Sequence, residues 1–292
     1  MKIGLGTAQL GLDYGIANRG GRPTRAEILA ILDCAVEHEI RVLDTSPSYG
    51  ECESRIGELE PSGARFSIVT KTPPLAGEVD AALHVKSHLR ESLRRLDAAS
   101  VHGLLVHRPE DLLGSRGREI HEALCELRAQ GTVSKIGVSV YTGSQIDAVL
   151  ERHPIDLIQI PLSVVDQRLL DSGHLRSLKA ANIEVHVRSV FLQGLLLLDP
   201  AELPAHFEPF REPLRNLSDA AEREGLTLLE AALGFVRGLA DVDLLICGVD
   251  SAAQLGQLVR AARRDVDPER FRGFGIGDPQ ILDPSRWPVG VR

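Results

Sequence analysis

Eight short apolar segments, separated by segments with helical periodicity, constrain the fold of this 292-residue chain more than any other feature. Short segments that are apolar on both faces are typical of parallel strands, and their alternation with helices implies right-handed crossovers within one sheet. Eight such units in a chain of this length predict an α/β fold, a (β/α)8 or TIM barrel. The expected strands are 2–7, 41–44, 66–71, 101–106, 135–140, 155–160, 184–190 and 243–248.

An open, doubly wound sheet is the structural alternative. Such a sheet usually carries a GxGxxG fingerprint after its first strand, and in GLGTAQLG the third glycine position is Gln9. The fingerprint is therefore absent, which favours the barrel. We expect Gly6 and Thr7 to form a strand end where the backbone closely approaches a ligand.

Helix start and stop signals predict the elements between the strands. Thr24 and Glu27 have the spacing of a capping box, and Gly131 can end a helix in the left-handed conformation. Leu83 and later leucines give one helix an apolar side, whereas prolines make 199–213 a predicted loop. The expected helices begin after Thr24 and then cover 51–59, 79–96, 119–130, 143–151, 167–181, 217–224, 228–239 and 251–263.

Composition and motifs argue against several classes of function. The formal net charge is -8 and the arginines are scattered, whereas nucleic-acid binding requires a basic face. We expect no signal peptide, and no apolar stretch is long enough to span a membrane. Four separated cysteines without a CxxC pair favour free thiols and a cytoplasmic location. His121 and Glu122 open an HExxH pattern, but Cys125 occupies its last position, so no metal site is indicated. No linker divides the chain, and we expect residues 1–292 to form a single domain.

Three consecutive predicted strands end in side chains that can move protons. VLDTSPSYG carries Asp44 and Tyr49, SIVTK ends on Lys71, and LLVHRP contains His107. Because the carboxyl ends of barrel strands share one rim, we expect these side chains to converge there. Each has an ordinary structural explanation when taken alone, and their shared position is what indicates a functional site.

The four side chains suit the polarisation of a carbonyl group while hydride arrives at its carbon. We expect Lys71 to pair with Asp44, and a lysine cation beside Tyr49 would lower the tyrosine pKa from about 10 toward neutral. Tyr49 could then exchange a proton at working pH while His107 orients the carbonyl oxygen. No side chain supplies hydride, so a cofactor is implied.

The chain resembles the aldo-keto reductases over nearly its whole length. The resemblance rests on GLGTAQLG, LDTSPSYG, IVTK, LLVHRP, IGVSV, LIQIP, VRSVFLQG and ICGVDSAAQL. It implies a (β/α)8 barrel that transfers hydride from a nicotinamide dinucleotide, usually NADPH, to an aldehyde or ketone. It further implies that Tyr49 is the general acid, Lys71 lowers its pKa, Asp44 pairs with Lys71, and His107 positions the carbonyl.

The resemblance also implies where the cofactor is held. Ser139 and Gln159 match residues that hold the carboxamide, and Arg188 stands where many members place an aromatic residue against the nicotinamide ring. A planar guanidinium can also stack on a ring. Gly248 and Ser251 begin a helix whose N-terminus suits a phosphate. The expected cofactor contacts are Gly6, Thr7, Ser139, Gln159, Arg188, Ser189, Gln193, Gly194, Gly248, Asp250, Ser251 and Gln254.

Asp250 departs from the family pattern. The family often places Lys, Ser or Arg just after the glycine of strand eight, where it binds the 2′-phosphate of NADP, which Asp250 would repel. An acid near a ribose is the solution that other folds use for NAD. The usual Glu-Asn pair at the adenine reads Gln257-Leu258. The resemblance therefore implies NADP(H), and Asp250 leaves NAD(H) as the alternative.

The substrate is expected to be a small carbonyl compound bound by aromatic side chains on loops. The candidates are Tyr14, Phe191 and Trp287, with loop 199–213 and tail 273–292 near the barrel mouth. The opening GTAQLGLDYGIAN resembles bacterial reductases of sugar, cell-surface or secondary-metabolite pathways, which implies a polar carbonyl or sugar substrate.

Two other functions stay open from the sequence. One is a lyase that forms a Schiff base on Lys71 and needs no dinucleotide. The other is a non-catalytic barrel that serves as a binding or regulatory partner, as the potassium-channel β subunits do. The sequence predicts no particular oligomeric state.

Overall fold

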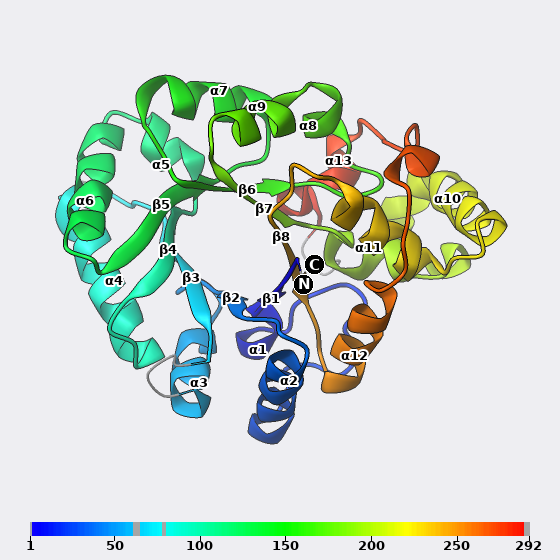
Figure 1. Cartoon of the computed structure of the whole chain (residues 1–292), viewed down its shortest axis with the longest axis horizontal. Coiled ribbons are helices and arrows are strands. Elements are labelled where there is room, and N and C mark those ends of the chain that lie inside the picture. The colour runs from blue at the N-terminus through cyan, green and yellow to red at the C-terminus, as the bar shows by residue number, and fades with distance from the viewer. Residues whose placement is uncertain (1, 61–64, 78–79, 289–292) are drawn as a thin grey trace.

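Eight parallel strands close into a barrel in which each strand pairs with the next in sequence and β8 pairs with β1 (Figure 1). The computed structural model describes residues 2–60, 65–77 and 80–288. The predicted TIM barrel is confirmed, as a single α/β domain. The strands are β1 (Ile3–Gly6), β2 (Val42–Asp44), β3 (Ser67–Thr72), β4 (Val101–Val106), β5 (Val133–Ser139), β6 (Leu157–Pro161), β7 (Glu184–Arg188) and β8 (Leu244–Gly248).

Helices surround the barrel, and α10 projects away from it (Figure 1). The α-helices are α1 (Ala8–Gly11), α2 (Arg25–Glu37), α3 (Cys52–Leu59), α4 (Ala81–Leu96), α5 (Pro109–Leu113), α6 (Gly117–Ala129), α7 (Gly143–Arg152), α8 (Arg168–Asp171), α9 (His174–Ala180), α10 (Arg211–Arg223), α11 (Leu228–Gly238), α12 (Ala252–Ala261) and α13 (Pro279–Leu282). The 3-10 segments are η2 (Leu192–Leu197), η3 (Pro200–Glu202), η4 (Ala205–Phe210), η5 (Pro268–Phe271) and η6 (Pro284–Arg286).

The predicted helix signals are largely confirmed. At the start of α2, Glu27 N donates to the Thr24 hydroxyl while the Glu27 carboxylate accepts from Thr24 N at 2.7 Å, which is the predicted capping box. Gly131 has φ +74 just beyond α6, as expected of a glycine that ends a helix.

Other helix predictions were wrong in their details. The single helix expected at 167–181 is divided into α8 and α9 by Gly173, whose φ is +79. Leu83 lies in the first turn of α4 and is 60% exposed, so it does not join the buried side of that helix. The segment 199–213 is not a plain loop, because it contains η3, η4 and the start of α10. The predicted start of α4 at residue 79 lies outside the described residues.

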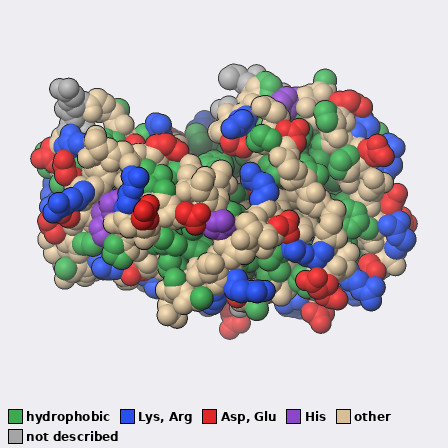
Figure 2. Space-filling model, turned by 90° about the horizontal axis from the view of Figure 1, so that it is seen from above, with side chains coloured by type: hydrophobic (Ala, Val, Ile, Leu, Met, Phe, Trp, Pro, Cys, Tyr) green, Lys and Arg blue, Asp and Glu red, His purple; other side chains and the backbone are tan. Residues whose placement is uncertain are grey.

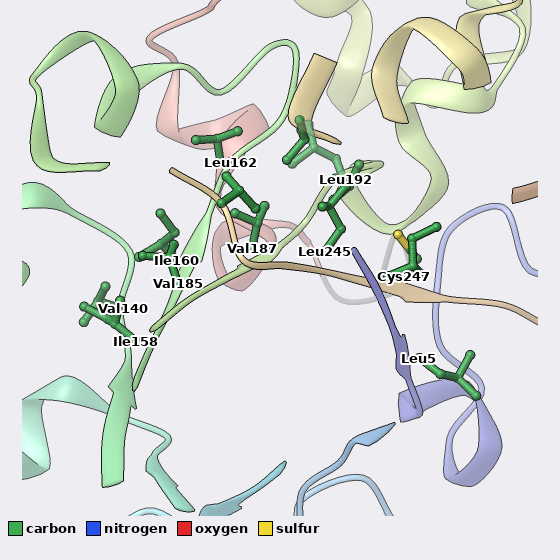
Figure 3. Close-up of a cluster of buried hydrophobic side chains, with 14 of the residues drawn as sticks. Leu5, Val140, Ile158, Ile160, Leu162, Val185, Val187, Leu192, Leu245 and Cys247 are labelled. Carbon is green, nitrogen blue, oxygen red and sulfur yellow. The ribbon is translucent and has the colours of Figure 1, made fainter. Parts of the chain in front are cut away.

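Most of the core lies between the strands and the helices. Figure 3 shows part of this layer, where Ile158 and Ile160 of β6 lie near Val185 and Val187 of β7. These side chains are fully buried. Because side chains alternate along a strand, the residues between them point into the barrel.

The barrel interior holds a second, small apolar core of Val69, Leu105 and Leu157. Glycines on neighbouring strands make room for it. A Cβ atom at Gly103 would lie 2.8 Å from Leu157 Cδ2, and one at Gly137 would collide with the Leu157 carbonyl. The interior is therefore closed below the mouth, and the polar strand ends lie above a packed floor.

The C-terminal tail packs onto the segment that follows β6. Ile276 N donates to the Val165 carbonyl at 2.8 Å, and Gln167 Nε2 donates to the Phe271 carbonyl at 2.9 Å. Residues 289–292 of the predicted tail lie outside the described residues. Acidic and basic side chains are interspersed over the face that Figure 2 shows. No helix among the described residues is long and apolar enough to cross a membrane.

Candidate active site

A buried ion pair lies at the rim where β2 and β3 end. Lys71 Nζ donates to Asp44 Oδ2 at 2.8 Å and to the Thr45 carbonyl at 2.9 Å. The Lys71 side chain is 1% exposed. Burial alone would lower the pKa of Lys71, but Asp44 and then Tyr49 outweigh it and raise that pKa above its ordinary value. Lys71 is therefore a fixed cation, as the sequence predicts.

Tyr49 lies over this cation. Its ring centroid is 5.1 Å from Lys71 Nζ. The expectation that its pKa falls toward neutral was wrong. Burial raises the pKa of Tyr49 above its ordinary value, and the lowering effect of Lys71 does not overcome it. Tyr49 consequently holds its proton at neutral pH, which is the state that a general acid needs.

His107 follows β4 and completes the group of four. Its ring meets the Tyr49 ring edge-on with 6.1 Å between centroids, and its Nδ1 lies 3.5 Å from the Ser46 hydroxyl. Burial, and then the nearby Lys71 charge, lower the pKa of His107 to about 4. The ring is therefore neutral at physiological pH. The four predicted catalytic side chains thus meet at one rim.

A chain of hydrogen bonds continues across the mouth from Asp44. Gln159 Nε2 donates to Asp44 Oδ1 at 2.8 Å, the Ser139 hydroxyl donates to Gln159 Oε1 at 3.3 Å, and Arg188 Nε donates to Ser139 Oγ at 3.4 Å. This chain joins the ends of β2, β5, β6 and β7. It fixes the side chains that the resemblance assigns to the carboxamide.

Sequence reasoning missed one aromatic residue of this mouth, Tyr141. The Arg188 guanidinium carbon lies 4.0 Å from the Tyr141 ring centroid, and both Arg188 and Tyr141 influence the titration of Tyr14. Burial and the proximity of Tyr49 raise the pKa of Tyr14 to about 12. The chain has three tyrosines, and all three therefore gather here. All three tyrosines follow predicted strand ends in the sequence, and this was the signal from which Tyr141 could have been predicted.

The segment after β7 has an unusual backbone. Ser189, Gln193 and Gly194 all have positive φ values, which is costly for the first two. The segment is held against the first loop, because Ile16 N donates to the Gln193 carbonyl and a Cβ at Gly194 would lie 2.6 Å from Ala17 Cβ. Gln193 Oε1 is buried without a hydrogen-bond partner within the described residues, although the Gln193 side chain interacts with Tyr14.

A second unpartnered oxygen lies where β8 leads into α12. Asp250 Oδ1 is buried without a hydrogen-bond partner within the described part of the chain, and burial raises the pKa of Asp250 although the Gln254 side chain interacts with its carboxyl group. The Ser251 hydroxyl accepts from Gln254 N, and Gln254 Oε1 accepts from Asp250 N at 2.7 Å. Gly248 lies against the Gln9 amide, which a Cβ would strike. Unsatisfied buried oxygens beside glycine and a helix N-terminus fit a large polar ligand such as a dinucleotide.

Two predicted contacts are opposed by the structure. Thr7 is fully buried and its hydroxyl donates to the Asp44 carbonyl at 2.8 Å, so it supports β2 instead of facing a ligand. Trp287 is 1% exposed, its Nε1 donates to the Ile281 carbonyl, and its ring packs edge-on against Phe207. Trp287 therefore fastens the tail and does not line a substrate pocket. Phe191 is partly buried at the start of η2, and its substrate role stays a prediction.

Comparison with known proteins identifies the protein family. The model of the aldo/keto reductase family matches residues 2–274. The chain belongs to this family. The aldo-keto reductase YhdN of Bacillus subtilis is 23% identical, with 88% of this chain and 83% of that protein covered. The D-threo-aldose 1-dehydrogenase of a Pseudomonas species is 25% identical, with 89% and 92% covered. The predicted family and the prediction of an oxidoreductase are thereby confirmed.

Solved structures agree on the fold of this aldo/keto reductase. The holo form of an aldo-keto reductase from Bacillus halodurans superimposes with a TM-score of 0.77 and 19% sequence identity. The match covers 98% of this chain and 95% of that one. Within the described part of this reductase, no group of three or more His, Cys, Asp or Glu side chains could hold a metal ion.

His107 should make the stability of this reductase depend on pH. Its pKa is about 4 in the folded protein against 6.5 for an unperturbed histidine, so the unfolded chain binds more protons below pH 6.5. We expect the free energy of unfolding to be unaffected by His107 protonation above pH 6.5 and to fall by about 2–3 kcal/mol as the pH is lowered from 6.5 to 4. Urea unfolding of wild type and His107→Gln across this range measures the difference. Parallel stability curves for the two proteins would contradict the prediction.

Proposed function

We propose that this aldo/keto reductase reduces a polar aldehyde or ketone with a nicotinamide dinucleotide, and that Tyr49 is the general acid. The observation that carries the proposal is the buried Lys71–Asp44 pair beneath a protonated Tyr49. Hydride is the chemistry that the bound cofactor supplies. Tyr49 gives its proton to the carbonyl oxygen, and the adjacent Lys71 cation stabilises the phenolate that remains.

His107 has a separate task in this proposal. A neutral imidazole beside Tyr49 can hold the carbonyl oxygen by a hydrogen bond without adding a positive charge to the mouth. Its lowered pKa keeps it in this form over the physiological range. The Ser46 hydroxyl near Nδ1 orients the ring.

The cofactor would lie along the ends of β5 to β8. Ser139 and Gln159 have a hydroxyl and an amide that could bind the carboxamide. Gln193 Oε1 and Asp250 Oδ1 are buried acceptors that could accept hydrogen bonds from the cofactor. Gly248 and the N-terminus of α12 suit the phosphates. The names of two relatives support a polar substrate. They are the D-threo-aldose 1-dehydrogenase and the pyridoxal 4-dehydrogenase of Microbacterium luteolum.

The two alternative functions have less support. A Schiff base requires a neutral lysine amine, whereas Asp44 and the Thr45 carbonyl hold Lys71 as a cation. A non-catalytic barrel would not need a protonated tyrosine against a buried cation. The convergence of all four proton-handling side chains favours the reductase.

Titration of the pure protein with NADPH and NADH tests the proposal. We expect the fluorescence of the reduced dinucleotides to report saturable binding of one or both, and their absorbance to fall when a sugar aldehyde or pyridoxal is added. Failure of both dinucleotides to bind at millimolar concentration would overturn the proposal. Borohydride trapping of a substrate on Lys71 would then indicate the lyase.

Asp250→Arg should change the choice of nucleotide. An acid at the start of α12 repels a 2′-phosphate, whereas an arginine attracts it, so we expect the affinity for NADPH relative to NADH to rise by about tenfold or more. Dissociation constants for both nucleotides measure this ratio. Asp265→Arg is the matched control, because it makes the same charge change at an exposed position. An unchanged ratio in Asp250→Arg would mean that the carboxylate does not face the ribose.

A further inference from the structure

Arg188 brings a positive charge to the mouth that no carboxylate neutralises. Its guanidinium donates to the Ser139 hydroxyl at 3.4 Å, the Ser189 hydroxyl at 3.2 Å and the Val140 carbonyl at 3.0 Å, all of which are uncharged. Among the described residues, no Asp or Glu forms an ion pair with it. The other cation of the mouth, Lys71, is paired with Asp44. Among the described residues, Arg188 is therefore the cation beside the Lys71–Asp44 pair that has no carboxylate partner of its own.

This charge is fixed in place and cannot be discharged. The guanidinium stacks on Tyr141 at 4.0 Å, is held by three acceptors, and belongs to a side chain that stays protonated in proteins. Its field reaches the reacting groups, because it acts on the titration of Tyr49, His107 and Tyr14. A ligand at this rim therefore meets a permanent cation.

We propose that Arg188 makes the site bind the reduced, neutral nicotinamide in preference to the oxidised, cationic one. The proposal rests on the proposed function, in which Ser139 and Gln159 hold the carboxamide. Arg188 Nε lies 3.4 Å from the Ser139 hydroxyl, so the guanidinium would be close to a nicotinamide whose carboxamide Ser139 holds. The oxidised ring carries a positive charge and the reduced ring does not. Two adjacent like charges repel, and this repulsion acts on the oxidised form alone.

The expected effect is large enough to measure. A neighbouring like charge usually shifts an ionisation equilibrium by about one to three pKa units. We therefore expect Arg188 to lower the affinity for the oxidised cofactor, relative to the affinity for the reduced one, by roughly tenfold or more. For a two-electron couple, a tenfold preference raises the reduction potential of the bound cofactor by about 30 mV. Arg188 would thus shift the balance on the protein toward carbonyl and reduced cofactor.

Dissociation constants of both redox forms test the proposal without measuring turnover. We would titrate wild type, Arg188→Gln and Arg188→Lys with the oxidised and the reduced dinucleotide by calorimetry. Wild type should bind the reduced form more tightly, Arg188→Gln should lose roughly tenfold of this preference, and Arg188→Lys, which keeps the charge, should retain most of it. Arg176→Gln on α9 is the matched control, because it removes the same charge from an exposed position and should leave the ratio unchanged.

The possible outcomes separate this proposal from the proposed function. If Arg188 only supports Tyr141 and Ser189, its loss will weaken both forms equally, and an unchanged ratio overturns the charge argument alone. Wild type that binds the oxidised form as tightly as the reduced form also overturns it, even if every Arg188 variant fails to fold. Wild type that binds neither form overturns the proposed function and this proposal together. Arg188→Met provides a second neutral variant if Arg188→Gln is unstable.

Discussion

Tyr49→Phe is expected to lower the turnover of a carbonyl substrate by roughly 10²- to 10⁴-fold, the usual contribution of a general acid. The phenyl ring would keep the packing over Lys71 Nζ and the edge-on contact with His107, because both contacts involve the ring. Only the hydroxyl that carries the proton is removed. The affinity for the reduced dinucleotide should therefore remain within about twofold of wild type.

Steady-state kinetics and dinucleotide titration together check this result. Tyr141→Phe is the matched control, because it removes a hydroxyl from another tyrosine of the same mouth without touching the Lys71–Asp44 pair. We expect that control to keep most of its turnover. Undiminished turnover in Tyr49→Phe would remove Tyr49 as the acid, and a parallel loss of dinucleotide binding would instead indicate a structural defect.

Of the substitutions proposed for this protein, Lys71→Met should destabilise the fold most, with a loss of about 3–5 kcal/mol in the free energy of unfolding. The substitution leaves the Asp44 carboxylate buried, with only the Gln159 amide among its present side-chain donors. Tyr49 would also lose the cation that stabilises its phenolate, so any remaining activity should shift to higher pH. Urea unfolding monitored by circular dichroism measures the stability, and a pH–rate profile measures the second effect.

A double variant separates the buried charge from lost packing. Asp44→Asn combined with Lys71→Met removes both charges and should recover part of the stability lost in Lys71→Met. Lys86→Met is the control, because Lys86 pairs with Glu126 at the surface and such pairs contribute about 0–1 kcal/mol. A loss below about 1 kcal/mol in Lys71→Met would contradict the prediction that the pair is buried and dry.

The sequence predicted the barrel and the meeting of Asp44, Tyr49, Lys71 and His107 because both follow from local periodicity. A parallel strand of known direction places its last residue at a known rim. The break in the predicted 167–181 helix depends on the left-handed conformation of Gly173, which nearby residues alone did not reveal.

Quantities that depend on burial could not be predicted in this way. The direction of the Tyr49 pKa shift is decided by how far desolvation outweighs the Lys71 charge, and desolvation depends on the whole mouth. Thr7 is held inside by Asp44, which is 37 residues away in the sequence. Trp287 is held inside by Phe207 of η4. Tyr141 was overlooked because its importance comes from its contact with Arg188, which lies at the end of β7.

The interlocked floor of the barrel limits how this reductase can evolve or be redesigned. A methyl group at Gly137 would collide with the Leu157 carbonyl, and one at Gly103 would press on the Leu157 side chain, so larger residues at these strand positions would disturb the packed floor. Variation that changes specificity must therefore come from segments that can lengthen without disturbing the strands. A library for a new substrate should diversify residues 12–23 and 195–213 and leave every strand as it is.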